Sequence, residues 1–339
     1  MKNVIIITSP NVTVTANNFD VLQKAAIGIS RAIPVTTIKD ALAVGKKRDL
    51  YITSVVGDII KLALRGRKNV LFWVQGILPE ESAMRHSSRL RFFLLSQMER
   101  FALSHSRYLA FVSEPKREHN EKKYKMSFEG KYYIFPCYNT TIYPETFYTE
   151  NKYKNNYFVY AGGLAVWQCF EKTLEIYKTV EDWGLPNTKL IVLTKNKQQA
   201  EADIISKGIK NYEIGFTTPE DLPNILKTAK FGFVIREDSP VNMVATPTKI
   251  STYLSCGLIP IFGSSVETFR RFSEKMKYAV SWSNSADDFK KVKGFMTSEI
   301  KSEDVLSEYK QFFDLNYSSE RHTEALRNII NGLIDESNN

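Results

Sequence analysis

Short apolar runs alternate with helix-like stretches along residues 1–136. Apolar residues at helical spacing predict helices over Phe19–Ile33, Gly57–Leu64, 88–105 and Glu114–Tyr124. The apolar runs predict strands over Val4–Thr8, Asp49–Val56, Val70–Val74, Tyr108–Ser113 and Lys131–Pro136. Strands and helices in alternation favour a parallel sheet with right-handed crossover connections.

The helix expected over 88–105 has a distinctive pattern. Its apolar residues recur at intervals that give the helix one apolar face. The rest of its surface and the following turn are decorated with arginines. The apolar residues are Leu90, Leu94, Met98 and Phe101, and the arginines are Arg89, Arg91, Arg100 and Arg107.

Residues 138–156 are rich in Asn, Thr and Tyr, which is typical of a linker. The alternation then restarts. We expect strands over Tyr157–Ala161, Lys189–Thr194, Tyr212–Phe216, Phe231–Ile235 and Leu258–Phe262. We expect helices over Phe170–Val180, Gln198–Lys207, Pro219–Thr228, Thr248–Ser255, 285–292, 302–312 and 319–335.

These patterns predict an α/β protein with two doubly wound domains, over residues 1–148 and 149–315. We expect the C-terminal helix, within 316–339, to pack back on the first domain. Ligands of open α/β sheets bind at the carboxyl ends of the strands. The candidate loops are therefore Ser9–Asn17, Gln75–Ser82, Ser113, Gly162–Gln168, Thr194–Lys197, Arg236–Lys249 and Gly263–Glu267.

The positive charge lies in the first half of the chain. The 339 residues have a formal net charge of +9. Residues 1–148 hold 22 Lys and Arg against 12 Asp and Glu, a net of +10, whereas residues 149–339 have a net of −1. This asymmetry suggests a polyanion, an anionic membrane surface or an acidic substrate, the alternative being a solvated basic surface.

The remaining composition excludes several classes of protein. Three separated cysteines suggest neither a disulfide framework nor a zinc site. The spacing of His86, His105 and His119 matches no zinc pattern. No apolar run is long enough to span a membrane or to form a signal peptide. We expect a cytoplasmic protein, peripheral on the cytosolic face of a membrane if the basic half binds lipid.

The segment from Phe231 to Phe262 carries the clearest chemical signal. A strand ends near Arg236, and a helix is expected after Thr246 and Pro247, with Thr246 as its cap and Pro247 in its first turn. Lys249 then falls in the first turn, where backbone amides already favour an anion. The pattern indicates a phosphate site, or alternatively a capped helix whose lysine faces solvent.

The sequence PTKISTYLSCGLIPI resembles the nucleotide-sugar signature of GT-B glycosyltransferases, particularly family 4. Weaker likenesses follow in the family's chain order, in ERFALSHSRYLAFVSEPKREH, YIFPCYNT, FVYAGGLAVWQCFEKTLEIYK and IKNYEIGFTTPEDLPNILKTAKFGFV. The resemblance spans about residues 70–335. It implies two Rossmann-like domains facing a central cleft, an acceptor in the first domain and a nucleotide sugar in the second.

Four positions depart from the family pattern. Where many members have two glutamates, this chain has Val244 and Thr252. Where many have an Arg and a Lys that hold the donor diphosphate, it has Gly163 and Gln168. Either the donor is held differently or the chain is an inactive relative.

The resemblance and the loop positions together define the predicted site. Lys249 and Arg236 would ease departure of the diphosphate, because a guanidinium binds phosphate oxygens as a fork. Glu81 would be a general base for an acceptor hydroxyl, unless Glu80 and Glu81 simply begin a helix. The predicted substrate-binding residues are Gly162, Gly163, Trp167, Gln168, Thr194, Lys195, Asn242, Pro247, Thr248, Thr252, Gln75, Gly76 and Glu80.

We therefore expect a glycosyltransferase that uses a nucleotide sugar, needs no metal or other cofactor, and builds a surface polysaccharide, glycolipid or glycoprotein glycan. Its partners would be a glycan or lipid-linked acceptor and an anionic membrane facing Arg85–Lys131, which holds 11 basic residues and 5 glutamates. Nucleic acid is not expected, because no recognition motif is present. The alternatives are a catalytically inactive scaffold or partner subunit, and another GT-B reaction such as epimerisation or polyol-phosphate transfer.

Overall fold

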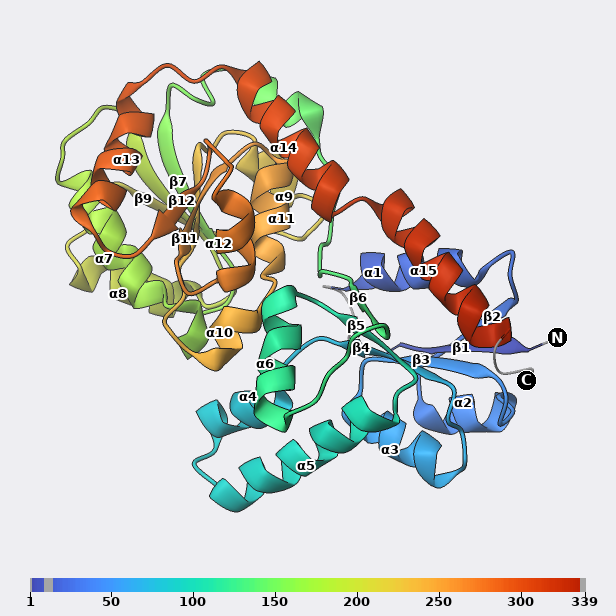
Figure 1. Cartoon of the computed structure of the whole chain (residues 1–339). Helices are drawn as coiled ribbons and strands as arrows, with labels where there is room; N and C mark the ends of the chain where they lie inside the picture. Colours follow the sequence, from blue (N-terminus) through green and yellow to red (C-terminus); the bar gives the residue numbers. More distant parts are fainter. Residues whose placement is uncertain (1, 9–14, 336–339) are drawn as a thin grey trace. The chain divides into compact units, whose positions relative to one another are not determined.

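The chain folds into two compact units, each built on one parallel sheet (Figure 1). The computed structural model describes residues 2–8 and 15–335. The first unit comprises the described residues of Met1–Asn139, Met243–Thr246 and Tyr317–Asn339, and the second comprises Thr140–Asn242 and Pro247–Asn316. Each sheet has six strands, and every strand pairing is parallel. The predicted doubly wound α/β class is confirmed.

The first sheet has the strand order β2-β1-β3-β4-β5-β6. Its strands β3 and β4 are buried along their whole length, which explains their continuous apolar sequence. The strands are β1 (Asn3–Ile7), β2 (Arg31–Val35), β3 (Leu50–Thr53), β4 (Val70–Val74), β5 (Tyr108–Phe111) and β6 (Tyr132–Ile134). The helices are α1 (Ala16–Ala26), α2 (Ile38–Val44), α3 (Val56–Leu64), α4 (Leu78–Arg85), α5 (Arg89–His105), α6 (Glu114–Tyr124) and α15 (Ser319–Asp335).

The helix predicted over Phe19–Ile33 is too long. It ends at Ala26, and Gly28 adopts a positive φ of 93° that closes the turn. The chain then forms the edge strand β2, which sequence reasoning missed. Its Pro34 lacks an N–H, which suits an edge strand and not a helix interior.

Helix α5 buries a different face from the one its apolar spacing suggests. The buried residues are Ser96, Glu99, Ala102 and Leu103. The Glu99 carboxylate accepts a hydrogen bond of 3.2 Å from the ammonium group of the fully buried Lys116 and one of 2.5 Å from the Tyr124 hydroxyl. A charged pair fixes this side of the helix, while Leu90 and Leu94 remain exposed.

The C-terminal helix α15 belongs to the first unit, where it lies along α1 (Figure 1). The carbonyl oxygen of Leu333 accepts hydrogen bonds from Asn69 Nδ2 at 3.3 Å and Arg107 Nη1 at 3.2 Å. A hydrogen bond of 2.7 Å joins His322 Nδ1 and the Tyr133 hydroxyl. Residues near both chain ends therefore complete one unit.

The second sheet has the order β12-β11-β10-β7-β8-β9. Helices α7 and α8 cover one face, and α11 and α12 cover the other (Figure 1). The strands are β7 (Asn156–Ala161), β8 (Thr188–Leu193), β9 (Tyr212–Gly215), β10 (Phe231–Val234), β11 (Ile259–Gly263) and β12 (Val280–Trp282). The helices are α7 (Phe170–Glu181), α8 (Lys197–Ser206), α9 (Leu222–Leu226), α10 (Pro240–Val244), α11 (Thr248–Ser255), α12 (Glu267–Ser273), α13 (Ala286–Thr297) and α14 (Ser302–Asn316), with short 3-10 turns at Pro144–Tyr148 and Val166–Gln168.

The units divide after Asn139, before the expected boundary at 148. Residues 140–155 pack on the second unit because their polar groups bond to it. The Tyr143 amide donates to the Ser255 carbonyl at 2.9 Å, and the Tyr153 hydroxyl donates to the Gly257 carbonyl at 2.8 Å. The predicted linker is thus largely a structured part of the second unit.

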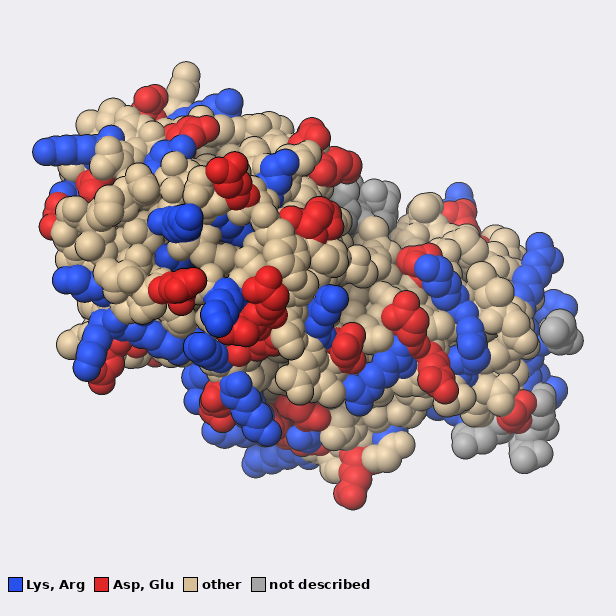
Figure 2. Space-filling view, turned by 90° about the horizontal axis from the view of Figure 1, so that it is seen from above, with Lys and Arg blue, Asp and Glu red and all other residues tan. Residues whose placement is uncertain are grey.

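The charge asymmetry of the sequence does not appear as a continuous basic field on the face drawn in Figure 2. Basic and acidic side chains are interspersed there. Among the described residues, none of the helices has the length and apolarity that crossing a bilayer demands.

Two glycines of the second unit should respond oppositely to alanine. A Cβ on Gly232 of β10 would overlap the ring of the fully buried Tyr253, whereas one on Gly294, at an exposed position of helix α13, meets nothing within 4 Å. We expect Gly232→Ala to lower the free energy of unfolding by about 1–3 kcal/mol through overpacking. Gly294→Ala should raise it by about 0.5–1 kcal/mol by removing helix-interior glycine. Urea unfolding measures both, and an unchanged Gly232→Ala would contradict this packing.

Candidate functional site

The candidate site lies where the order of strands in the second sheet reverses. Strands β7 and β10 are neighbours, and their connections leave in opposite directions along the sheet. Because the two strands are parallel, Gly162 after β7 and Arg236 after β10 lie at the same edge. This reversal is the point at which open α/β sheets bind ligands.

Gly162 brings the backbone close to a lysine. Its φ is 142°, which side-chain-bearing residues rarely adopt, and its amide donates to the Leu193 carbonyl at 2.8 Å. A Cβ at this position would stand 2.7 Å from Lys249 Nζ. Glycine is therefore required for the ammonium group to lie over this turn.

Two cations converge on one amide oxygen. Lys249 Nζ and Arg236 Nη1 each donate to Gln168 Oε1 at 2.7 Å. Arg236 Nη1 also donates to the Trp167 carbonyl at 2.9 Å. Lys249 Nζ lies 4.5 Å from the centre of the Tyr160 ring. The turn after β7, the end of β10 and the start of α11 thus meet through these side chains.

No carboxylate compensates this pair in the part of the chain that the structure describes. Burial, and then the positive charge of Arg236, lowers the pKa of the Lys249 ammonium group to about 7. Burial likewise lowers the pKa of Arg236. Two neighbouring positive charges in a partly buried site favour an incoming anion.

The start of helix α11 adds to the same potential. Its N-cap is Pro247, and no side chain caps the helix. The prediction that Thr246 caps this helix is wrong. The Thr246 hydroxyl instead accepts a hydrogen bond of 3.4 Å from the Cys137 amide. Because proline places the helix start one residue later, Thr248 and Lys249 form the first turn, where backbone N–H groups favour a phosphate.

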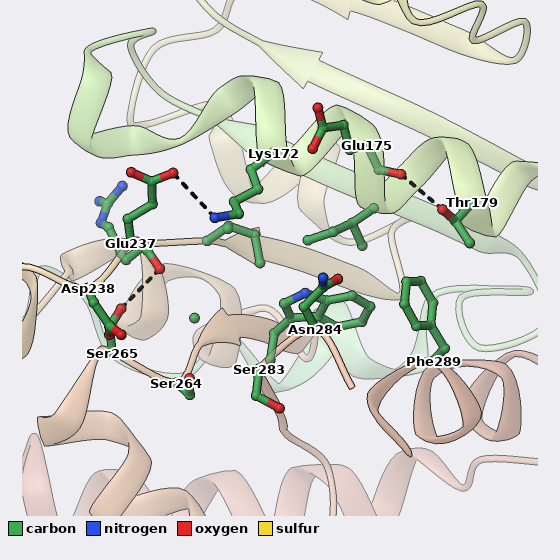
Figure 3. Close-up of a pocket in the computed structure, with 15 residues that line it drawn as sticks. Lys172, Glu175, Thr179, Glu237, Asp238, Ser264, Ser265, Ser283, Asn284 and Phe289 are labelled. Carbon is green, nitrogen blue, oxygen red and sulfur yellow. Dashed lines mark hydrogen bonds and ion pairs between the residues drawn. The ribbon is translucent and has the colours of Figure 1, made fainter. Parts of the chain in front are cut away.

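A cavity of about 420 Å³ adjoins this region in the same unit. Helix α7, the loops after β10, β11 and β12, and helix α13 line it (Figure 3). Lys172 Nζ lies 3.3 Å from Glu237 Oε1 across one side, and Trp282 and Phe289 supply aromatic surface. Figure 3 also labels Ser264, Ser283 and Asn284 among the residues that line it. Mixed aromatic and hydroxyl groups suit a sugar-like ligand.

Sequence reasoning included the loops after β10 and β11 but missed the contributions of α7 and α13. Lys172 and Phe289 sit at ordinary helical spacing, and only the fold brings them to one cavity.

The other predicted donor residues have local partners. Thr194 is buried, and its hydroxyl accepts from the Asn196 amide at 3.2 Å. Asn242 Nδ2 donates to the Glu237 carbonyl at 2.8 Å and closes the loop after β10. The Thr252 hydroxyl donates to the Thr248 carbonyl at 3.0 Å. Lys195 is exposed above the Phe216 ring, and Gly163 accepts from the Tyr160 hydroxyl at 2.6 Å.

In the first unit, Gln75 and Gly76 follow β4, and Glu81 folds back toward them. Glu81 Oε1 accepts from the Ile77 amide at 3.1 Å, at the beginning of α4. A Cβ on Gly76 would overlap this carboxylate. Glu81 therefore does cap its own helix, and it stays our prediction for a base. Of the predicted loop Ser9–Asn17, residues 9–14 lie outside the described residues.

Glu80 is held by two cations. Its Oε1 lies 2.7 Å from Lys123 Nζ and 3.3 Å from His119 Nε2. Burial alone would raise the pKa of this carboxyl group, but the hydrogen bonds from His119 and Lys123 outweigh it and lower the pKa to about 2. So weak a base is poorly suited to deprotonating a hydroxyl.

The described residues contain no cluster of His, Cys, Asp and Glu able to hold a metal ion. His105 stacks on Phe101, with 3.7 Å between ring centres, and His119 contacts Glu80.

Known structures share this architecture. Neither a protein-family profile nor a curated protein sequence matches the chain. A UDP-forming α,α-trehalose-phosphate synthase from Burkholderia xenovorans superposes with a TM-score of 0.68 at 9% identity, over 100% of both chains. The E. coli trehalose-6-phosphate protein bound with UDP-2-fluoro glucose gives a TM-score of 0.65 at 10% identity, covering 98% of this chain and 99% of that one.

S. aureus TarM, in complex with UDP and alpha-GlcNAc-glycerol, gives a TM-score of 0.64 at 11% identity. The alignment covers 87% of this chain and 58% of TarM, so the chain spans little more than half of that relative. These similarities confirm the GT-B fold that the sequence resemblance implies.

The Lys249 ammonium group should lose its proton near neutral pH. After reductive methylation with ¹³C-formaldehyde, its NMR signal is identified by its loss in Lys249→Arg. We expect a titration midpoint near 7. In Arg236→Met the midpoint should rise, because a neighbouring positive charge is gone, yet stay low because burial is the larger cause. A wild-type midpoint above about 10, that of a solvated lysine, would refute this electrostatic description.

Proposed function

We propose that the protein is a glycosyltransferase that moves a sugar from a nucleotide-activated donor to a hydroxyl group of a glycan, glycolipid or glycoprotein, in the synthesis of a surface polysaccharide. The observation that carries the proposal is the uncompensated pair of Lys249 and Arg236 at the strand-order reversal. The similar folds of two proteins whose structures hold UDP or a UDP sugar support it.

The pair suits the departing diphosphate. In glycosyl transfer, negative charge grows on the diphosphate as its bond to the sugar breaks, and preorganised cations stabilise that charge most in the transition state. Arg236 can bind two phosphate oxygens, and Lys249 supplies a point charge beside the amides that begin α11. Gln168 Oε1 accepts hydrogen bonds from these donors in the present structure, and we propose that a phosphate oxygen would take its position.

A donor must be held here without the paired glutamates of many family members. Val244 is buried, and the Thr252 hydroxyl bonds to its own helix. We propose that the cavity of Figure 3 accepts a hydroxyl-rich part of the donor, where Glu237 and Asp238 provide carboxylates. Trp167, Gly163, Thr194, Lys195 and Asn242 remain our predicted donor contacts, together with Pro247 and Thr248.

The acceptor is proposed to bind the first unit, near Gln75, Gly76 and Glu81. Cytoplasmic residence is proposed because Cys137, Cys169 and Cys256 are all free thiols, as in a reducing compartment. No metal ion or further cofactor is proposed as a requirement.

Donor binding should stabilise the protein and should need both cations. At about 100 times the dissociation constant, a nucleotide sugar adds about 2.7 kcal/mol to the free energy of unfolding. We expect Lys249→Ala and Arg236→Ala to lose this stabilisation and to lower transfer about 100-fold or more, the scale of one lost charge-stabilising group.

Thermal unfolding against a panel of nucleotide sugars and a product assay measure these effects. Lys301→Ala, which removes an exposed lysine of the same unit, is the control and should behave as wild type. Near-normal transfer by Lys249→Ala would refute the assignment. If no nucleotide sugar stabilises the wild-type protein, the result favours the alternative of an inactive scaffold.

Glu81→Gln separates catalysis from capping. The amide oxygen of glutamine can still accept from the Ile77 amide, so the thermal midpoint should stay within about a degree of wild type. If Glu81 is the general base, kcat should fall about 100-fold while donor-induced stabilisation persists. Glu80→Gln, which removes a carboxylate already neutralised by Lys123, should leave kcat far less affected. An unchanged kcat in Glu81→Gln would contradict the role of Glu81 as general base and leave it only the role of capping helix α4.

A further inference from the structure

The hairpin of helices α4 and α5 presents apolar side chains that its own unit does not cover. None of residues 89–94 is buried, so the first turns of α5 contribute no side chain to the core of the unit. In Figure 1 this end of α5 extends away from the sheet. The large apolar residues exposed on the hairpin, with their exposed fractions, are Leu78 (37%), Met84 (46%), Leu90 (69%), Phe92 (36%), Phe93 (57%) and Leu94 (52%).

The exposed apolar residues lie opposite the face by which α5 packs. With 3.6 residues per turn, Leu90, Phe93 and Leu94 share one side, and Ser96 and Glu99 share the other. The packed side is fixed by the buried pair of Glu99 and Lys116. A rotation of α5 that buried the apolar side would expose that pair's polar groups, so the apolar side stays outside the core of the unit.

Positive charge flanks the apolar side. Arg89 and Arg100 fall on one flank and Arg91 on the other, and the described structure gives none of them an ion pair. From Ser82 to Met98 the sequence contains no Asp or Glu. A helix with an apolar centre and arginine flanks is the pattern that lies in the interface of an anionic bilayer.

A basic cavity lies beside this helix. Its volume is about 390 Å³, and Ser96, Gln97, Arg100, Lys123, Tyr124 and Lys125 line it. Lys123 Nζ lies 5.2 Å from the centre of the Phe92 ring, so the cavity borders the apolar side chains. Arg100 and Lys125 are exposed cations at its rim. The combination fits the phosphate of a lipid whose chains lie next to Phe92 and Phe93.

We propose that the α4–α5 hairpin docks on an anionic lipid bilayer, with Leu90, Phe93 and Leu94 entering the interface and Arg89, Arg91, Arg100 and Lys125 binding lipid phosphates. The docking surface is thus a small part of the basic stretch Arg85–Lys131. It does not depend on the proposed transfer reaction, because no residue of the Lys249 site takes part.

Flotation of the full chain with vesicles tests the proposal. The probe is a vesicle of phosphatidylcholine with about one third phosphatidylglycerol, compared with phosphatidylcholine alone. We expect wild-type protein to float with the anionic vesicles at low salt, and less protein to float at about 1 M salt, where the screening length is about 3 Å.

Two variants separate the apolar and electrostatic contributions. Phe93→Glu with Leu94→Glu should lower binding at least about tenfold at any salt concentration, because acidic side chains cannot enter the interface. Arg89→Glu with Arg91→Glu should lower binding about tenfold at low salt and little at high salt. The matched controls, Ile205→Glu on exposed α8 and Lys290→Glu with Lys301→Glu, should float as wild type.

Thermal unfolding checks that each variant is folded, which the exposure of the substituted residues favours. The proposal is overturned if wild-type protein stays at the bottom with anionic vesicles at low salt, or if Phe93→Glu with Leu94→Glu floats unchanged. It is also overturned if wild-type protein ignores vesicles but self-associates through these residues, since the occupant would then be a second copy. Nucleotide-sugar binding, measured in parallel, fails or succeeds independently.

Discussion

The second unit is organised around two positive charges that share one neutral acceptor. Lys249 and Arg236 both reach Gln168 Oε1, and each depends on a different part of the fold. The Lys249 ammonium group lies close to Gly162, where a Cβ would stand 2.7 Å from it and where the φ of 142° disfavours a residue with a side chain. Arg236 requires β10 to lie beside β7. An amide oxygen satisfies the donors without cancelling their charge, so the cations keep their attraction for an anion.

This arrangement gathers positive charge beside Gly163 and Gln168, the positions at which many proteins of the family that the sequence resembles have an arginine and a lysine. Arg236 comes from the loop after β10. It donates a hydrogen bond to Gln168, which lies at the end of the turn after β7. Gln168 Oε1 accepts a hydrogen bond from each of the two cations. The same burial that lowers the pKa of Lys249 would strengthen its interaction with a bound phosphate, since neighbouring water screens it less.

Much of this fold follows from sequence periodicity, because parallel strands buried on both faces read as continuous apolar runs. Helices Glu114–Tyr124 and Thr248–Ser255 have the predicted bounds. Lys249 and Arg236 could be named from their loops, but their convergence on Gln168 could not. Arg236 lies 68 positions and Lys249 lies 81 positions after Gln168 in the sequence. Only the order of the strands brings these residues together. Strand β2 was missed because its five residues include an arginine and a proline.

Helix α5 shows where periodicity misleads. Its spacing correctly identifies an apolar face, yet the first unit buries the side that carries Glu99. A sequence pattern contains no information about Lys116, which lies on α6 and has no other carboxylate contact within hydrogen-bond distance among the described residues. Pairing that ammonium group outweighs covering a few leucines, because an unpaired buried charge is far more costly.

The path of the chain also bears on how the protein is made. Helix α15 completes the first unit through Leu333 and His322, although the residues of the second unit, Thr140–Asn242 and Pro247–Asn316, lie between it and Asn139 in the sequence. During synthesis the second unit can close while the first still exposes the surface of α1 and the ends of β3 and β4. The first unit can therefore be completed only after the residues of the second unit have been synthesised.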